Sequence, residues 1–290
     1  MLIERKGESR TDFIGKKNRA LILVPVYHGG ALVWNEKISF TQIERVFAEE
    51  ELAFLMPRRL RTPWVGEALA RHTSWRIERV PAMWMQSLSA YNAMMLSPRF
   101  YRRFQRYEHI LICQLDAAPF TNRLAEFCQM EYDYYGAPWL YPWSLHEIDG
   151  RHVRMRAGNG GFSLRRTAAC IGVLERHAEV VASWEMPEDV FFAYAGKYLD
   201  KNFRVAPMKI ARQFAVESEA LRHVKKCGGQ MPFGCHGWAR YSSEFYRQVF
   251  AILGYDLGTY SAEMQDGDFK DLACFLVRWK DIRREKGKNS

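Results

Sequence analysis

The sequence lacks the glycine-rich signatures of two common nucleotide-binding folds. It contains neither GxGxxG nor GxxxxGK[ST], which disfavours a dinucleotide-binding domain and a P-loop NTPase. Its six cysteines include no CxxC pair. Cys227, Cys235 and His236 offer three zinc ligands without a fourth at a suitable spacing, so a zinc site is disfavoured. Reduced, unpaired thiols favour a cytoplasmic protein.

Long apolar runs are also missing. The longest run, residues 20–27, is interrupted by Pro25 and is far too short to cross a bilayer. The first twenty residues carry no apolar core of the signal-peptide kind. These absences predict a cytoplasmic protein that is soluble or at most peripheral on the inner face of a membrane.

The composition is that of a folded, basic protein. Of 290 residues, 48% are hydrophobic and 14% aromatic, which is enough apolar surface to exclude a mostly disordered chain. The net charge of +9 favours phosphate-bearing partners such as nucleotides, nucleic acid or an anionic membrane. The positive charges are spread in short clusters, with a denser run from Arg278 to Lys288, and form no recognised nucleic-acid-binding helix or aromatic RNA-binding motif, so we expect no nucleic-acid partner.

Apolar runs alternate with segments of helical spacing through the first half of the chain. Continuous apolar runs are typical of strands covered on both faces, as in a parallel sheet. Strands are predicted at residues 20–27, 51–56, 75–80, 110–115 and 162–164. Helices are predicted at residues 36–51, 86–96, 98–107, 122–130, 166–177, 188–198 and 269–285. The alternation predicts an α/β fold: a single Rossmann-like domain with a central, mostly parallel sheet flanked by helices.

Three parts of the chain are distinguished by composition. Residues 1–19 form a polar N-terminal arm, residues 20–240 the α/β domain, and residues 241–290 a C-terminal helical extension. Within the domain, residues 134–158 are aromatic and irregular, as loops that cover a site often are, and residues 158–161 are expected to form a loop.

Two predicted strands end in residues suited to ligand binding. In an open α/β sheet, ligands bind beyond the carboxyl ends of the strands. The first strand runs through Pro25 and Tyr27 into a glycine-containing loop, and a later one ends at Asp116, whose carboxylate could bind a divalent cation. The ordinary alternative for Asp116 is to cap the helix near Asn122.

Three later segments carry further candidates. Asn159, Gly160 and Gly161 belong to a glycine-rich stretch that allows close approach of a ligand, although a plain turn explains it equally well. Glu188 and Asp189 follow Pro187 at a predicted helix start, where the helix dipole would keep a catalytic carboxylate ionised. The alternative is that the two acids only stabilise the helix by matching its dipole. His236 lies between small residues and Trp238. It is interpreted either as a metal or phosphate ligand or as a structural histidine.

The order of these motifs resembles that of nucleotide-sugar-dependent glycosyltransferases with the A-type fold. In particular, it is similar to a family of bacterial glycosyltransferases long carried as a domain of unknown function. The resemblance covers roughly residues 20–240. It rests on Gln114-Leu115-Asp116-Ala117, Tyr91-Asn92, Gly136-Ala137-Pro138-Trp139, the run from Gly158 to Arg165, Glu188-Asp189-Val190-Phe191-Phe192 and His236-Gly237-Trp238.

The resemblance implies transfer of a sugar from a nucleotide-sugar donor to a hydroxyl of a glycan or lipid-linked glycan acceptor. Inversion at the anomeric carbon and a place in bacterial surface polysaccharide synthesis are expected with it. Asp189 is the expected general base, with Glu188 holding sugar hydroxyls beside it. The donor is expected to contact Pro25, Tyr27, Asn92, Asp116, Asn159, Gly160 and Gly161. Acceptor sugars are expected to stack on Trp139, Tyr141 and Trp143, whose alternative role is a lid packed on the core.

A metal ion, Mn²⁺ or Mg²⁺, is expected at Asp116 and His236, where it would meet the donor diphosphate. Many A-type enzymes hold this ion with Asp-x-Asp, whereas this sequence has Gln114-Leu115-Asp116 and retains one carboxylate. Metal dependence is therefore an expectation from the resemblance, not from a complete motif.

Two other classes of function stay open. A sugar-nucleotide nucleotidyltransferase shares the sheet architecture, but it usually has Arg and Lys in the loop after the first strand, and His28-Gly29-Gly30-Ala31 has neither. A non-catalytic protein that binds nucleotides or a membrane surface would use the basic residues from Arg278 to Lys288 beside Trp279. That segment predicts peripheral contact with an anionic membrane, or a terminal helix packed by its apolar face.

Overall fold

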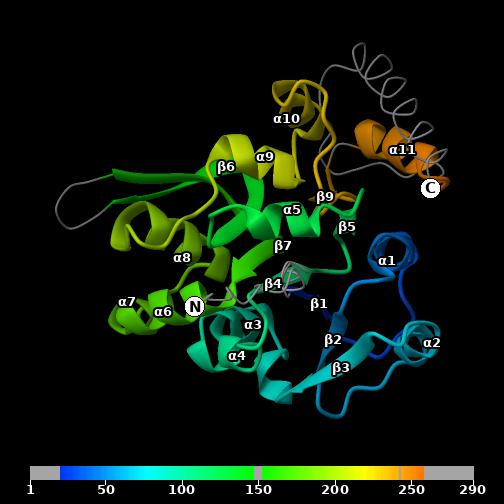
Figure 1. The fold of residues 1–290 in the computed structure, drawn as a ribbon, viewed down its shortest axis with the longest axis horizontal. Coiled ribbons are helices and arrows are strands. Elements are labelled where there is room, and N and C mark those ends of the chain that lie inside the picture. The colour runs from blue at the N-terminus through cyan, green and yellow to red at the C-terminus, as the bar shows by residue number, and fades with distance from the viewer. Residues whose placement is uncertain (1–19, 147–151, 242, 258–290) are drawn as a thin grey trace, which may run out of the picture.

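A computed structural model of the chain describes residues 20–146, 152–241 and 243–257 (Figure 1). Its main sheet has six strands in the order β3-β2-β1-β4-β7-β6. The strands are β1 (Ala20–Pro25), β2 (Leu52–Pro57), β3 (Trp75–Val80), β4 (His109–Cys113), β6 (Tyr134–His146) and β7 (His152–Arg166). β1 to β4 pair in parallel, and β7 and β6 are antiparallel additions at one side. The predicted α/β class with a mostly parallel sheet is confirmed.

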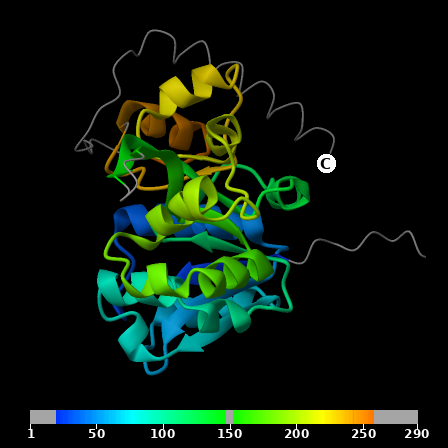
Figure 2. The ribbon, with the colours of Figure 1, turned by 90° about the vertical axis from the view of Figure 1, so that its left-hand side faces the viewer.

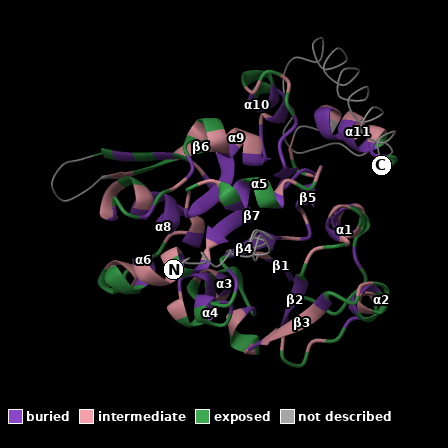
Figure 3. Cartoon of the chain, in the orientation of Figure 1, coloured by how far each residue is buried: buried purple, intermediate pink, exposed green. Residues whose placement is uncertain are grey.

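Helices cover both faces of this sheet, because successive strand residues point to opposite sides. Ile22 and Val24 of β1 face one apolar cluster, and Leu21 and Leu23 face the other. The first cluster includes α1 (Trp34–Phe47), α2 (Pro63–Arg71), α5 (Leu124–Gln129) and α9 (Met208–Phe214). The second includes α3 (Leu88–Met95), α4 (Pro98–Arg102), α6 (Thr167–Arg176) and α8 (Glu188–Tyr194). Helices such as α1 and α2 are accordingly buried on one side and exposed on the other, whereas α8 is buried along nearly its whole length (Figure 3).

The segment predicted to be irregular is a long β-hairpin. β6 and β7 pair from Tyr134 to His146, and the predicted loop at residues 158–161 lies inside β7. The outer part of β7 shows the two-residue alternation of a half-buried strand, with Val153 and Met155 buried and the intervening arginines exposed. Register shifts interrupt the pairing near Ala137 and Pro138, and at the adjacent Gly136 the two backbones approach closely, because a Cβ there would lie 2.4 Å from the Asn159 carbonyl oxygen. The aromatic residues and glycines of this hairpin conceal the strand pattern in the sequence.

A second, three-stranded sheet stands at the end of β4. It pairs β5 (Ala118–Pro119), β9 (Gly234–Cys235) and β8 (Ala215–Val216). α10 (Ala220–Lys226) and α11 (Ser243–Ile252) share an apolar cluster with it. Figure 2 shows α9 to α11 stacked on the half of the molecule that the first strands and helices form.

Short elements complete the described chain: η1 (Ala82–Trp84), α7 (Ala178–Ala182) and η2 (Ala195–Leu199). Of the extension predicted at residues 241–290, α11 is described, whereas the predicted helix at 269–285 and the polar arm at 1–19 lie outside the described residues. None of the helices in the described ranges is long and apolar enough to cross a bilayer. The five cysteines in those ranges are free thiols.

Candidate functional site

Three strands of the main sheet bring sequence-predicted residues to one edge. β1 ends at Pro25, and Asp116 follows the end of β4. β7 pairs antiparallel with β4, and the Gln114 N–H donates to the Gly161 carbonyl over 2.9 Å. Because β7 runs against β4, residues 158–161 lie beside the carboxyl end of β4, next to Asp116.

The small second sheet delivers His236 to the same edge. Its backbone N–H donates to the Val216 carbonyl (3.0 Å), and the next N–H, of Gly237, donates to the Asp116 carbonyl (3.0 Å). The His236 ring then lies between two carboxylates: Nε2 is 3.2 Å from Asp116 Oδ1, and Nδ1 is 3.0 Å from Glu217 Oε1. Residues 116, 217 and 236 are thus joined in one polar cluster.

This cluster keeps His236 positively charged. Burial favours the neutral ring, but the two carboxylates outweigh it and raise the pKa of His236 to about 10. Burial likewise opposes ionisation of Asp116, but the cations of His236 and Arg240 hold the pKa of that carboxyl well below its usual range. Arg240 Nη2 lies 3.1 Å from Asp116 Oδ2. The cluster therefore holds two cations, His236 and Arg240, and two carboxylates, Asp116 and Glu217, so that its formal charges balance.

The stretch Asn159–Gly161 forms the floor of the cluster. The Asn159 amide donates to both oxygens of Glu217 (3.2 Å each), and its oxygen accepts from the Gly161 N–H (3.1 Å). Residue 161 must be glycine, because a Cβ there would lie 2.1 Å from His236 Nε2. The Asn159 side chain therefore positions Glu217, rather than standing open toward a sugar as the sequence suggested.

A buried ion pair supports the floor from below. The Arg165 guanidinium donates to both oxygens of Glu188 (2.9 Å each), and the two side chains are 0% and 5% exposed. Arg165 also donates to the Tyr101 hydroxyl (2.9 Å) and lies over the Tyr134 ring, 5.1 Å from its centroid. Charge-assisted bidentate pairs of this kind are geometrically rigid. Because Arg165 holds both oxygens of Glu188, this carboxylate supports the start of α8 beside Asp189 and has no oxygen left without a partner for sugar hydroxyls.

Asp189 extends from the start of α8 to this floor. Its Oδ2 accepts the Gly160 N–H over 3.0 Å. Burial, reinforced by the neighbouring charge of Glu188, raises the pKa of Asp189 to about 7. The helix-dipole argument from sequence is thus wrong in direction, because desolvation outweighs the dipole of a seven-residue helix.

Tyr27 and Asn92 line the approach from the other side. Tyr27 is 43% exposed, and its ring packs edge-on against the buried Tyr91 at 5.7 Å between centroids. The Asn92 amide oxygen accepts the Glu188 N–H at 3.5 Å. The motif Tyr91-Asn92 thus connects α3 to the start of α8.

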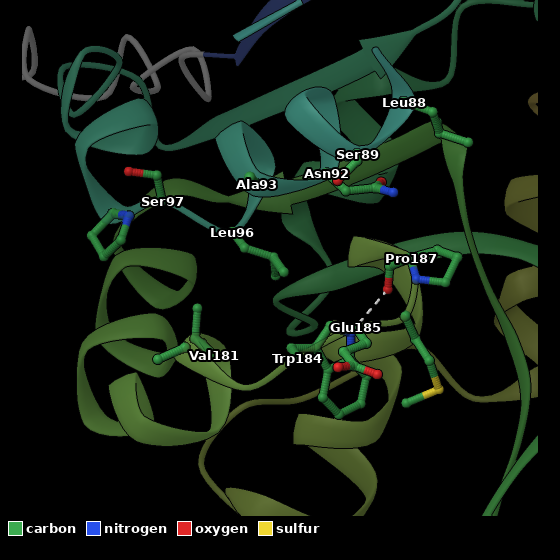
Figure 4. A pocket seen from close by; sticks show the side chains of 13 residues that line it. Leu88, Ser89, Asn92, Ala93, Leu96, Ser97, Val181, Trp184, Glu185 and Pro187 are labelled. Atoms are coloured by element: carbon green, nitrogen blue, oxygen red, sulfur yellow. Dashed lines mark hydrogen bonds between the residues drawn. The ribbon is translucent and has the colours of Figure 1, made fainter. Parts of the chain in front are cut away.

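A cavity of about 880 Å³ opens beside this connection, between α3 and the segment before α8 (Figure 4). Asn92 and Pro187 form one side of it, and Leu88, Leu96 and Trp184 make it largely apolar. The Trp184 indole is fixed by donating to the Pro187 carbonyl over 3.2 Å.

The three predicted acceptor-binding aromatics lie along β6. The Trp139 ring covers Gly158, where an added Cβ would lie 2.9 Å from it, so this ring adjoins the floor. Tyr141 and Trp143 lie farther out on the hairpin, which projects from the sheet (Figure 1), and are 74% and 36% exposed. The structure therefore brings Trp139 to the other predicted residues and leaves Tyr141 and Trp143 outside them.

Sequence reasoning missed three members of the site. Glu217 follows a two-residue strand without any motif, and Arg240 lies four residues past His236 without a pattern. Arg165 closes the Gly158–Arg165 motif, and a buried arginine partner for Glu188 could have been suspected from it. Their partners lie 19 to 124 residues away in the chain, beyond the reach of local patterns.

The cluster offers a limited set of ligands for a divalent cation. Over the described ranges, no group of three or more His, Cys, Asp or Glu side chains gathers as a metal site would. An amide oxygen completes a candidate set, because Gln114 Oε1 and Asp116 Oδ1 each lie 3.2 Å from His236 Nε2. Neighbouring ligands of an octahedral ion with bonds of about 2.1 Å stand about 3 Å apart. Glu217 holds the far nitrogen of the ring, as carboxylates often do for metal-binding histidines. These residues fit the expected Mn²⁺ or Mg²⁺ only when Nε2 of His236 has given up its proton, because a metal binds the neutral ring.

Comparisons with known proteins place the central part of the chain in a family. The family model described as "Protein of unknown function (DUF5672)" matches residues 74–236, more than half of the chain. No curated protein matches the sequence.

Several solved structures are similar to this chain, among them three glycosyltransferases. One is involved in the glycosylation of the major capsid of PBCV-1 (TM-score 0.44, 11% identity, covering 76% of this chain and 92% of that one). Another is the apo form of GlyE of Streptococcus pneumoniae TIGR4 (TM-score 0.43, 10% identity, 92% of this chain and 64% of that one). The third is the bifunctional glycosyltransferase WbbM (TM-score 0.47, 9% identity, 91% of this chain), of which this chain spans about half, 52%.

Proposed function

We propose that this chain, which belongs to the family described as protein of unknown function DUF5672, is a nucleotide-sugar-dependent glycosyltransferase. It moves a sugar to a hydroxyl of a glycan or lipid-linked glycan, in bacterial surface polysaccharide synthesis, at the cytoplasmic face of the membrane. One observation carries the proposal. A single carboxylate with a pKa near neutrality, Asp189, is held over the same glycine floor that adjoins the charged cluster of Asp116 and His236.

Asp189 is the general base of the proposed reaction. A base acts best when its pKa lies near the working pH, and about 7 satisfies this condition. Asp189 takes the proton of the acceptor hydroxyl as that oxygen attacks the anomeric carbon. The Gly160 N–H fixes the carboxylate in place.

The pairing of Glu188 favours inversion. A retaining mechanism through a covalent intermediate requires a second free carboxylate close to the sugar. Both oxygens of Glu188 accept from Arg165, so that neighbour is not available as a nucleophile. Direct attack by the acceptor, with one base, inverts the anomeric centre.

Asp116 and His236 would act on the leaving diphosphate through a bound cation, because the Asp116 carboxylate alone would repel it. Together with Gln114 they would hold Mn²⁺ or Mg²⁺, which supplies charge neutralisation to the leaving group when bound. Glu217 keeps the His236 ring oriented through Nδ1, so that Nε2 faces Asp116. Arg240, at 3.1 Å from Asp116, adds a second positive charge.

The remaining residues position the two substrates. Tyr27 and Asn92 would contact the donor, with Gly160 and Gly161 under its sugar, and Pro25, which is buried at the end of β1, would support Tyr27 from behind. Trp139 would stack on the acceptor sugar next to the floor, and Tyr141 and Trp143 would reach a longer acceptor along the hairpin. Holding both substrates in line accounts for a large part of the rate enhancement in such bimolecular reactions.

Nucleotide binding tests the proposal without knowledge of the acceptor. Calorimetry with UDP and GDP is expected to show binding that Mn²⁺ strengthens, and Asp116→Asn is expected to abolish the strengthening. Asp200→Asn is the matched control, because Asp200 also pairs with an arginine but lies after η2, outside the site. Equal nucleotide affinity with and without Mn²⁺ in the unmodified protein would contradict the metal role, and no binding of either nucleotide would contradict the transferase.

A further inference from the structure

Three arginines stand unpaired in the loop that follows β2. Arg58, Arg59 and Arg61 are exposed, and none of them pairs with a carboxylate in the described part of the chain. Many other surface arginines of the described chain do form such pairs, for example Arg71 with Glu44. A concentration of three free cations within four residues indicates an anionic partner.

This loop lies between two other loops at the site's edge of the sheet. On one side the Arg58 N–H donates to the Val80 carbonyl at the end of β3 (2.9 Å). On the other side the Arg61 carbonyl lies 2.9 Å from the position of a Cβ on Gly29, in the loop after β1. The three loops therefore stand together at the carboxyl ends of β1, β2 and β3, where Tyr27 opens the site.

The segments after β1 and β3, which include η1 and the start of α3, expose apolar side chains. Val33, Met83 and Leu88 are 53%, 65% and 75% exposed. Of the seven large hydrophobic side chains exposed within the described ranges, five lie in the segments after β1 and β3. Leu88 also lines the largely apolar cavity beside Asn92 (Figure 4), so the exposed apolar surface continues into a space next to the site. Clusters of exposed apolar side chains mark interaction surfaces.

We define these six residues, Val33, Arg58, Arg59, Arg61, Met83 and Leu88, as the rim, and we infer that the rim docks on an anionic phospholipid surface. Cations alone would suit any polyanion, and apolar side chains alone would suit any protein. Their alternation along adjacent loops suits the boundary between headgroups and acyl chains, where both kinds of side chain are stabilised. Docking there turns the mouth of the site toward the membrane.

Docking would present a lipid-linked acceptor directly to Asp189. Only this consequence rests on the proposed function. The binding itself requires neither donor nor catalysis. It is also independent of the basic segment from Arg278 to Lys288, which lies outside the described residues.

Vesicle flotation of the full chain tests the inference. We expect flotation with vesicles of phosphatidylglycerol and phosphatidylcholine, and none with phosphatidylcholine alone. The triple variant Arg58→Gln, Arg59→Gln and Arg61→Gln should bind about one hundredfold more weakly, at about 1 kcal/mol for each arginine near a charged surface. The paired substitution Met83→Ser and Leu88→Ser should weaken binding at physiological salt by at least about tenfold.

A matched triple variant controls for net charge. Arg99, Arg154 and Arg156 are also exposed, and their change to glutamine removes the same charge away from the rim. This variant should float like the unmodified protein. Equal loss in both triple variants, or full binding in the rim variants, would overturn the inference and assign vesicle binding to net charge or to another segment.

Nucleotide binding separates this outcome from failure of the proposed function. The rim triple variant should bind UDP and GDP as the unmodified protein does. If it loses nucleotide affinity while it still floats, the arginines bind the donor and the docking inference is wrong. Failure to float in the unmodified protein, with nucleotide binding intact, would overturn the docking alone.

Discussion

Asp189→Asn is expected to make the protein more stable above neutral pH while it removes the proposed base. The carboxyl of Asp189 has a pKa of about 7 in the folded protein, raised by burial and by the charge of Glu188. In an unfolded chain the same group has a pKa of about 3.9. A carboxyl whose pKa is raised by folding binds its proton more tightly in the native state. Folding is therefore increasingly opposed as the pH rises from about 4 through 7, and the full cost is present above 7.

The size of the effect follows from the shift. A shift of about three pKa units corresponds to about 4 kcal/mol of unfolding free energy, at about 1.4 kcal/mol per unit. Because the Asp189 side chain is partly exposed, we expect a gain between about 2 and 4 kcal/mol. Asparagine removes the buried charge and keeps one oxygen, which can accept the Gly160 N–H, whereas the Val190 N–H that Oδ1 accepts over 2.8 Å loses its partner and reduces the gain. The gain should be fully present at pH 8 and fall to about a quarter of that value at pH 4.5, where a carboxyl with a pKa of about 3.9 is still mostly ionised in the unfolded chain.

Urea unfolding at pH 4.5, 6, 7 and 8 measures this directly, with the free energy of unfolding of the unmodified protein and of Asp189→Asn compared at each pH. The difference should grow with pH and level off above about 7.5. A variant that is less stable at pH 8, or a difference that does not change with pH, would refute the account of a desolvated carboxylate at this site.

Three further predictions concern groups on which the fold and the site depend. Burial lowers the pKa of His109 to about 4, so the stability that its neutral form contributes is lost as the pH falls from about 6.5 through 4. His109→Leu removes this titration. In urea unfolding, the variant should therefore keep a larger share of its pH 7 stability at pH 4.5 than the unmodified protein does. Arg165→Met leaves a buried carboxylate unpaired and should lower the free energy of unfolding by about 3 to 5 kcal/mol; a loss below about 1 kcal/mol would show that the pair is not buried in solution. Gly161→Ala places a methyl group against the His236 ring and should eliminate Mn²⁺-stimulated nucleotide binding in calorimetry, whereas Gly66→Ala, with open space at its Cβ, should leave it unchanged.

The sheet was predictable because its central strands carry their pattern locally. Residues 20–25 and 109–113 are covered on both faces, and a continuous apolar run is the direct consequence of that burial. The hairpin of β6 and β7 was not predicted, because its pairing across Gly136 and the register shifts near Pro138 depend on tertiary contacts.

The candidate site was predictable in its motifs and not in its contacts. Asp116 was singled out at the end of a strand, Asp189 at the start of a helix, and His236 between small residues and Trp238, and the fold brings the three to one edge. The partners that set their charges, Glu217 and Arg165, are selected by long-range packing. For the same reason, the direction of the Asp189 pKa could not be obtained from its place at a helix start.

The most direct test of the central claim is turnover of a nucleotide sugar by the unmodified protein and by Asp189→Asn. UDP- and GDP-sugars are incubated with Mn²⁺, and transfer or slow hydrolysis of the donor is measured beside nucleotide affinity. A positioned general base contributes about 10² to 10⁴-fold, so kcat should fall by at least about two orders of magnitude while donor affinity stays nearly unchanged. Undiminished turnover in Asp189→Asn, with the donor bound normally, would contradict the assignment of Asp189 as the base.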